Sequence, residues 1–143
     1  MEDNAITEVI IGCAYAVHNN LSAGFLEKVY ENALRIELEA KGFKALQQEP
    51  IKVWYKNQIV GDYFADLWVE DRIIVELKAI QTLSKDNELQ LVNYLTATGI
   101  DSGLLINFGP SVQIRRKYRE YEPAHPNKSI LRNPVNPVYS QKR

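Results

Sequence analysis

The sequence predicts an α/β fold in which a mixed central β-sheet is flanked by helices. Apolar residues recur at helical spacing over residues 5–40, alternate at period two over 47–80, and return to helical spacing over 84–98. Residues 103–108 are apolar at all but one position, as in a strand whose two faces are both covered. The expected element order is therefore α-α-β-β-β-α-β-β.

Two helices are expected first. In residues 5–18 the apolar positions fall on one helical stripe, which ends at Asn19-Asn20. Residues 25–40 repeat the pattern and stop at Lys41-Gly42, where glycine suits a left-handed helix end. Ser22 is a candidate N-cap for this second helix.

Three strands should follow as an antiparallel meander. They cover residues 47–56, 59–70 and 73–80, with turns at Asn57-Gln58 and at Glu70-Asp71-Arg72. These stretches are rich in β-branched and aromatic residues, which suit the half-buried, pleated surface of a sheet.

A third helix is expected from Ser84 to Gly99, followed by the buried strand 103–108 and an edge strand over 112–118. Because this helix connects the third strand to the fourth, those two strands should be parallel, with a right-handed crossover. The result is a mixed sheet with helices on both faces.

The 143 residues fit one domain, expected over residues 1–119. Residues 120–143 hold four of the six prolines and are mostly basic or polar, so an extended or disordered tail is expected there. No apolar run approaches ~18 residues, and the acidic N-terminus is unlike a signal peptide. A cytoplasmic protein without a membrane segment is expected.

The net charge of -1 hides an asymmetry. Residues 1–109 hold 9 Lys or Arg and 16 Asp or Glu, whereas residues 110–143 hold 8 and 2. The basic C-terminal part, including Arg115, Arg116 and Lys117, could contact phosphate or simply form a solvated edge. A single cysteine, Cys13, excludes an intramolecular disulfide and a Cys-rich zinc site, and its place on an apolar stripe predicts a buried thiol.

The third strand carries unexpected charges. Glu76 and Lys78 lie two residues apart among Ile, Val, Leu and Ala, so both project from one face of the sheet. Burying an unpaired carboxylate costs several kcal/mol, so a partner is required. A mutual ion pair between Glu76 and Lys78 is the plainest explanation.

The preceding strand offers a second explanation. If the turn centres on Asp71, Val69 pairs with Ile73, and Asp66 lies directly across from Glu76 on the same face. Two close carboxylates repel unless a cation lies between them. Oxygen ligands without nearby His or Cys favour Mg²⁺ or Mn²⁺. A shift of one residue in the register would separate the pair.

Asp66 followed by Glu76-Leu77-Lys78 resembles the D…(D/E)-x-K signature of the PD-(D/E)XK nuclease superfamily. Four blocks in order, Gly24-x-x-Glu27-x-x-Tyr30, "VELKA", "NYLTATG" and "GLLINFG", are similar to the bacterial GxxExxY protein family. The resemblance covers roughly residues 5–117. It implies a restriction-endonuclease-like fold and Mg²⁺-dependent hydrolysis of nucleic-acid phosphodiesters, with DNA expected ahead of RNA.

The resemblance also implies residue roles. Asp66, Glu76, Leu77 and Glu27 would contribute to the metal site, and Lys78 would be the catalytic lysine. Gln90 and Tyr94 resemble a Gln-x-x-x-Tyr element of some superfamily branches, and Tyr30 would support the site. The alternative for Glu27 is a solvated helix carboxylate, as expected for Glu31 and Glu37, and the alternative for both tyrosines is a place in the core.

Two other functions fit the same residues. The fold could be a non-catalytic module that binds nucleic acid or protein, which the acidic body of the chain favours. It could also be a metal-dependent hydrolase of a smaller phosphoester, which would need a closed pocket. A homodimer is a reasonable way for so short a chain to grip a duplex.

Overall fold

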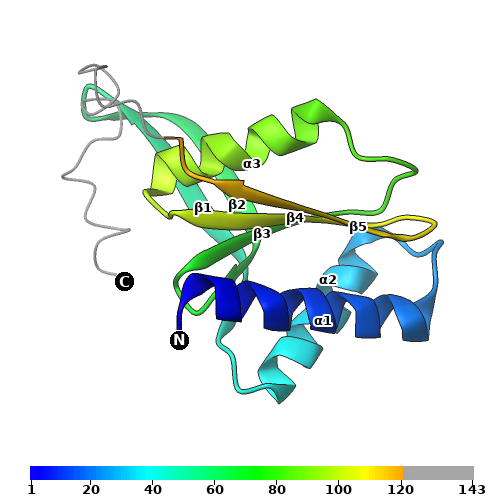
Figure 1. Cartoon of the computed structure of the whole chain (residues 1–143). Coiled ribbons are helices and arrows are strands. Elements are labelled where there is room, and N and C mark those ends of the chain that lie inside the picture. The colour runs from blue at the N-terminus through cyan, green and yellow to red at the C-terminus, as the bar shows by residue number, and fades with distance from the viewer. Residues whose placement is uncertain (121–143) are drawn as a thin grey trace.

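The computed structural model describes residues 1–120 and has the predicted element order. The elements are α1 (Asp3–Leu21), α2 (Glu27–Ala40), β1 (Ala45–Tyr55), β2 (Gln58–Val69), β3 (Ile73–Lys78), α3 (Lys85–Thr98), β4 (Ser102–Phe108) and β5 (Val112–Tyr118) (Figure 1). Of the tail expected over 120–143, all but Glu120 lies outside the described residues.

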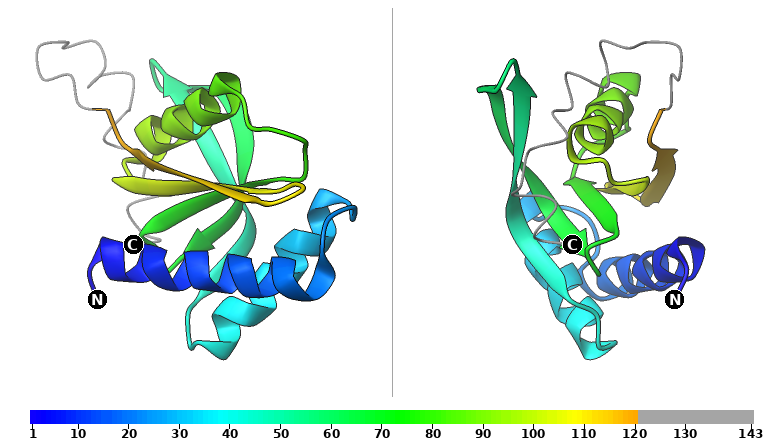
Figure 2. Two further views of the ribbon diagram at one scale, coloured as in Figure 1. Left: turned by 45° about the vertical axis from the view of Figure 1, so that its right-hand side comes forward. Right: turned by 90° about the vertical axis from the view of Figure 1, so that its left-hand side faces the viewer.

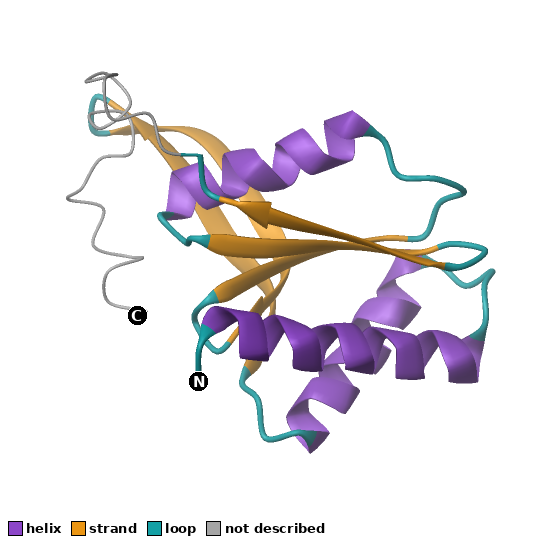
Figure 3. Cartoon of the chain, viewed as in Figure 1, coloured by secondary structure: helices purple, strands orange, loops and turns teal. Residues whose placement is uncertain are grey.

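The strands form one mixed sheet in the order β1-β2-β3-β4-β5 (Figure 3). β3 and β4 are parallel and are joined through α3, which confirms the predicted crossover. The other neighbours are antiparallel, and β5 is an edge strand as expected. The α/β class with a mixed sheet is confirmed.

Helices cover both faces of the sheet: α1 and α2 lie on one face and α3 on the other (Figure 2). Ile10, Tyr30 and Leu34 pack with Val75 and Leu104 on the first face. On the second face, α3 packs against another set of strand residues, namely Ile51, Ala65, Trp68, Ile74 and Leu105. Burying each large apolar side chain stabilises the fold by roughly 1.5–3 kcal/mol. Because helices cover both faces of the sheet, β3 and β4 are apolar on both faces.

The ends of α3 agree with the sequence, whereas the start of α2 does not. Ser84 caps α3 by accepting a hydrogen bond from Asn87 N, in a capping box, and Gly99 ends the helix. Ser22, however, is the C-cap of α1, with its N–H bonded to His18 O, and Leu26 occupies the N-cap position of α2. The Ser22 prediction was wrong because α1 runs three residues past His18.

One of the two predicted turns is displaced. The β1–β2 turn is made by Lys56 and Asn57, both with positive φ, rather than by Asn57-Gln58. The primed turn that this backbone forms matches the twist of a hairpin, and asparagine tolerates it well. The β2–β3 turn is Glu70-Asp71-Arg72 as predicted, again with positive φ at Glu70 and Asp71.

No helix within residues 1–120 is both long enough and apolar enough to cross a membrane. Cys13 is buried against the first apolar layer, as predicted, and burial raises the pKa of its thiol.

Candidate functional site

The site lies where β2 and β3 separate. Their pairing consists of Val69↔Ile73, Trp68↔Ile74 and Leu67↔Val75, so the turn does centre on Asp71. β2 continues beyond this point as one arm of the long β1–β2 hairpin, while β3 continues beside β4. A gap therefore opens between the two strands at the level of Asp66 and Glu76.

Asp66 and Glu76 close this gap with their side chains. The Asp66 N–H donates to Glu76 Oε2 at 2.8 Å, and the Leu77 N–H donates to Asp66 Oδ2 at 2.8 Å. The carboxylates thus occupy positions that carbonyl groups would take in a continued ladder. The predicted meeting of Asp66 and Glu76 across the hairpin is present.

The strands change face at this level. On β2, Ala65 packs in the α3 layer, Leu67 in the α1/α2 layer and Trp68 again in the α3 layer, so strict alternation fails around Asp66. Gln48, at the corresponding level of β1, has φ 52 and no ladder partner. These two irregular residues interrupt the sheet surface and free two polar side chains to meet in the gap.

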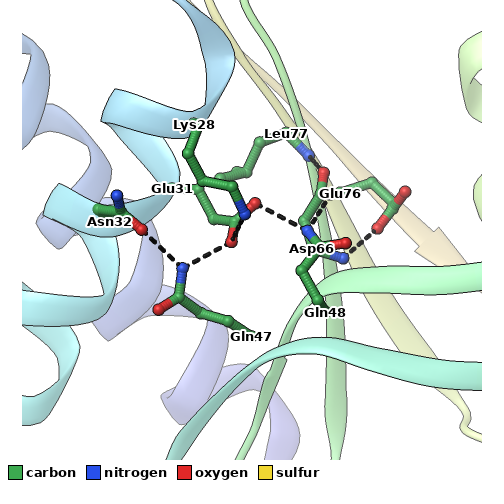
Figure 4. Close-up of polar contacts among 8 residues, drawn as sticks. All are labelled: Lys28, Glu31, Asn32, Gln47, Gln48, Asp66, Glu76 and Leu77. Atoms are coloured by element: carbon green, nitrogen blue, oxygen red, sulfur yellow. Dashed lines mark hydrogen bonds and ion pairs between the residues drawn. The ribbon is translucent and has the colours of Figure 1, made fainter.

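A polar network around the buried Glu31 supports Asp66 from the side of α2 (Figure 4). Gln48 Nε2 donates to Asp66 Oδ1 at 3.2 Å and to Glu31 Oε1 at 2.9 Å. Glu31 Oε2 also accepts from Lys28 at 2.9 Å and from Gln47 at 2.6 Å. Glu31 is only 2% exposed, so its expected role as a solvated helix carboxylate is wrong.

Gln48 and Glu31 were missed by sequence reasoning for different reasons. Glu31 follows Glu27 by four residues, and residues so spaced share a helix face. That spacing could have revealed it. Gln48 has no comparable signal, because only the left-handed backbone at that position turns its amide toward Asp66.

Burial is the largest cause of the raised pKa values of both carboxyl groups. Burial, and then the adjacent Asp66 carboxylate, raises the pKa of Glu76 well above its usual range. Burial also raises the pKa of Asp66, although the Leu77 N–H and the Gln48 amide act against it. Both carboxyl groups therefore hold a proton to higher pH than in water, mainly because burial disfavours the charged form.

Lys78 supplies the nearest positive charge. It forms no ion pair with Glu76 or with any other residue in 1–120, so the simple Glu76–Lys78 pair is not the explanation for these charges. Its ammonium nevertheless lowers the pKa values of Asp66, Glu76 and Glu27 through space. Because no carboxylate within residues 1–120 forms an ion pair with it, this ammonium is available to a substrate.

The chain just beyond Lys78 is held by Asn107 of β4. Asn107 is fully buried, accepts from Ile80 N at 2.9 Å and donates to Ile80 O at 2.9 Å. The amide thereby continues the β3–β4 ladder after the last regular pair, Lys78↔Asn107. This clamp fixes the point at which Lys78 leaves the sheet.

Glu27 lies at the first position of α2 and is half-buried. Burial, and then the Asp66 carboxylate, raises the pKa of Glu27. The Glu27 carboxylate therefore lies close enough to Asp66 to interact with its charge, and it approaches from the α2 side. Leu77, also predicted at the metal, has a fully buried side chain in the α1/α2 layer, so only its backbone can take part.

Tyr30 holds the entry to α2 rather than facing the carboxylates. Its ring stacks on Phe108 at 4.7 Å, and its hydroxyl donates to Ser22 O at 2.6 Å and accepts from Phe25 N at 3.2 Å. Gly24 in the same loop has φ 113, a conformation that side chains rarely adopt. The loop that delivers Glu27 is thus fixed by Gly24 and Tyr30.

Gln90 and Tyr94 approach from the opposite side of the sheet, on α3. Gln90 Nε2 donates to the Tyr94 hydroxyl at 3.0 Å. Burial and then the Glu76 carboxylate raise the pKa of Tyr94 to about 12. The phenol is therefore a neutral hydrogen-bonding group near Glu76, held by Gln90.

The donor set suits a hard divalent cation. Mg²⁺ is commonly held by one or two carboxylates together with water and phosphate oxygens, and Asp66 with Glu76 provides two. A cation here would offset the cost of burying these carboxylates, together with the repulsion that Asp66 exerts on Glu76. Among residues 1–120, however, no three His, Cys, Asp or Glu side chains are arranged to hold a metal ion, so Glu27 does not complete a three-carboxylate cluster here.

The basic residues of β5 are already paired within the domain. Arg116 bonds to Glu8 and to Thr7, and Arg119 pairs with Asp101 at 2.6 Å. Lys117 pairs with Glu88 at 2.5 Å, and Arg115 approaches the same carboxylate at 3.8 Å. The solvated-edge interpretation of this strand fits better than a free phosphate-binding row.

Comparison with known proteins identifies one matching family model, that of the PD-(D/E)XK nuclease superfamily, over residues 4–119. No curated protein matches the chain. A solved structure described as the crystal structure of SSO0001 is similar, with a TM-score of 0.52 and 16% sequence identity. The alignment covers 91% of this chain but 64% of SSO0001, less than two thirds of that protein, and at this identity it speaks for the fold alone.

Proposed function

The chain belongs to the PD-(D/E)XK nuclease superfamily, and on that basis we propose that it hydrolyses nucleic-acid phosphodiesters at Asp66, Glu76 and Lys78. The observation that carries this proposal is the pair of carboxylates in the β2–β3 gap beside an ammonium that has no ion-pair partner within residues 1–120. Family membership suggests nuclease-like chemistry, and the residue roles are our proposal.

Each residue has a distinct task. Asp66 and Glu76 would hold Mg²⁺ or Mn²⁺ through their carboxylates, with the Leu77 backbone and Glu27 as further oxygen donors. When bound, such an ion supplies Lewis-acid polarisation of the phosphate and a more acidic water. Lys78 would orient the attacking water at its Nζ and offset the negative charge that develops on the phosphate.

Residues around the proposed metal site keep these groups in position. Gln48 and Glu31 hold Asp66 from the α2 side, and Asn107 fixes the backbone after Lys78. Gln90 and Tyr94 would place a hydrogen-bond donor near the phosphate from α3. Supporting contacts of this kind preserve a catalytic geometry that loose side chains would lose.

We further propose that the chain is a member of the GxxExxY branch. Gly24, Glu27 and Tyr30 then have complementary tasks in one loop and helix start. Gly24 provides the left-handed turn, Tyr30 ties the loop to Ser22 and Phe25, and Glu27 would add a carboxylate to the acidic pair.

DNA is the first substrate to test, ahead of RNA, and a homodimer in the cytoplasm is the form that we propose. The short chain of 143 residues supports the dimer, because one domain of this size offers little surface for gripping nucleic acid. The rival proposal, a non-catalytic binding module, draws support from the acidic body and from the incomplete carboxylate cluster within residues 1–120.

One experiment separates the two. Purified protein with Mg²⁺ or Mn²⁺ is incubated with single-stranded, duplex and branched DNA and RNA, beside the Glu76→Ala and Lys78→Ala variants. The nuclease proposal expects metal-dependent cleavage that both substitutions abolish. Cleavage that survives both would indicate contamination, and a parent protein that neither cleaves nor binds metal by calorimetry would favour the binding module.

A further inference from the structure

A groove of about 710 Å³ lies between the β1–β2 hairpin and α3. Its volume is within the roughly 300–1,000 Å³ range of pockets for small molecules. The hairpin supplies Trp54 and Tyr63, and α3 supplies Leu89, Gln90, Asn93 and Tyr94. Figure 2 shows the hairpin extending past the rest of the sheet alongside α3.

The groove has aromatic walls. The rings of Tyr63 and Tyr94 lie 5.6 Å apart at 43°, and Tyr63 keeps 44% of its surface exposed. The β1–β2 register shifts between Val53 and Trp54, and both of these consecutive residues line the groove. The shift leaves Val60 of β2 without a ladder partner, which is the pattern of a β-bulge on that strand.

A glycine in the β1–β2 hairpin determines where the Tyr63 ring lies beside the groove. A side chain at Gly61 would meet Tyr63 Cε2 at 2.9 Å and Val53 at 3.2 Å. Only glycine therefore allows the Tyr63 ring to lie where it does against the strand. The position of this aromatic wall is built into the backbone.

The groove surface is mainly apolar, and its polar side chains along α3 include Asp86, Asn87 and Thr96. Trp54 Nε1 is buried and has no hydrogen-bond partner in the part of the chain that the structure describes, so the indole offers a ligand its ring rather than its N–H. Asn93 and Gln90 add exposed amides, and the lining includes no Lys or Arg.

Tyr94 is the residue that links the groove to the acidic pair. It lines the groove, and the Glu76 carboxylate contributes to the raised pKa of its hydroxyl. The absence of cationic lining residues leaves the binding of phosphate to the site itself.

We propose that this groove binds an unpaired nucleobase of the substrate, stacked against Tyr63 and Trp54, so that the enzyme acts on single-stranded or locally unpaired nucleic acid. The inference rests on the proposed nuclease function and adds its substrate class. Base–aromatic stacking is tolerant of sequence because every base has a π-face, and a base must leave its duplex partner to enter such a groove. DNA and RNA share this chemistry.

The test measures binding without metal, so that cleavage plays no part. Fluorescence anisotropy with EDTA compares short labelled single strands of DNA and of RNA, the same DNA as a blunt duplex, and a strand of equal length whose sugars lack bases. We expect the base-containing single strands to bind at least about tenfold more tightly than the abasic strand and the duplex, given stacking worth ~1–3 kcal/mol per base.

Variants assign the effect to the groove. Tyr63→Ala and Trp54→Ala should each weaken single-strand binding about tenfold, whereas Tyr63→Phe should retain it. Phe64→Ala is the matched control, since Phe64 is the neighbouring exposed aromatic residue and does not line the groove. Thermal unfolding of each variant verifies that the fold is intact.

The outcomes separate this inference from the nuclease proposal. Base-dependent binding that Tyr63→Ala removes supports the groove even if no metal-dependent cleavage is found. Equal binding of abasic and base-containing strands, preference for the duplex, or an unaffected Tyr63→Ala variant overturns it, whether or not the protein cleaves. Failure to bind any single strand overturns it as well.

Discussion

The Asp66 N–H donates to the Glu76 carboxylate at 2.8 Å, so the backbone of one acidic residue holds the side chain of the other. The Leu77 N–H returns the interaction by donating to Asp66 at 2.8 Å. Hydrogen bonds from the backbone therefore hold the two acidic side chains in place beside each other. This arrangement has consequences for stability, metal binding and catalysis that can be measured.

Metal binding should stabilise the protein through Glu76. At a free Mg²⁺ concentration of 100 times its Kd, the free energy of unfolding should rise by about 2.7 kcal/mol. Glu76→Ala should lose most of this increase, because one of the two carboxylates in the gap is gone. Thermal unfolding with and without Mg²⁺ measures the effect, with Glu39→Ala on the outer surface of α2 as control. Equal stabilisation of Glu76→Ala would count against a metal at this pair.

Stability of the metal-free protein should fall as pH rises. The folded-state pKa of Glu76 lies well above its ordinary value of 4.5, so between those two values the folded protein binds more protons than the unfolded chain. The free energy of unfolding therefore decreases with pH across that window. Below the ordinary value the favourable protonated state is fully populated.

Glu76→Gln isolates this effect, because the amide oxygen can still accept from Asp66 N while the charge is removed. Relative to the parent, the variant should gain stability as the pH rises from 4.5 toward the raised pKa of Glu76. Urea unfolding in EDTA at several pH values gives the comparison. A stability difference that does not change with pH would contradict a raised pKa at Glu76.

Lys78 should matter to the chemistry far more than to the fold. It is only partly buried and forms no ion pair within residues 1–120, so Lys78→Met should unfold close to the parent temperature. Its loss should reduce kcat by roughly 10²–10⁴-fold, the range for a group that orients or transfers a proton. Lys41→Met, at the exposed end of α2, is the control. Activity within a few-fold of the parent would remove Lys78 from the proposed mechanism.

Glu31 should stabilise the fold and position Asp66. Glu31→Ala removes the acceptor that the amides of Gln47 and Gln48 share, and we expect a loss of about 1–3 kcal/mol. Glu39→Ala, which removes an exposed ion pair with Arg35 on the same helix, should cost about 0.5 kcal/mol or less. Chemical denaturation measures both, and similar losses would show that burial of Glu31 contributes little.

Local signals in the sequence were sufficient for most of the fold. Ser84 with Asn87 and Gly99 determine the two ends of α3, and Asp71 at the centre of a three-residue turn determines the register that pairs Val69 with Ile73. These features depend on residues close together in the chain. The crossover of α3 then requires β3 and β4 to be parallel.

The rest depended on contacts that no local pattern encodes. Ser22 looks like a helix start but ends α1, because α1 extends to Leu21 and the short loop leaves Leu26 before α2. Gln48 reaches Asp66 only through its left-handed backbone, and Asn107 of β4 clamps Ile80 from 27 residues away. Alternation alone therefore located the acidic pair but not the residues that support it.

The separation of β2 from β3 also affects the order in which the molecule assembles. Asp66 and Glu76 are only 10 residues apart on one hairpin, whereas Gln48 meets Glu31 across 17 residues and Asn107 meets Ile80 across 27. Short loops close at lower entropic cost, so the hairpin that brings the two carboxylates together should form early. At that stage water still screens the charges. Their repulsion then becomes large only when α2, α3 and β4 arrive to cover them, by which time the apolar core is present to offset it.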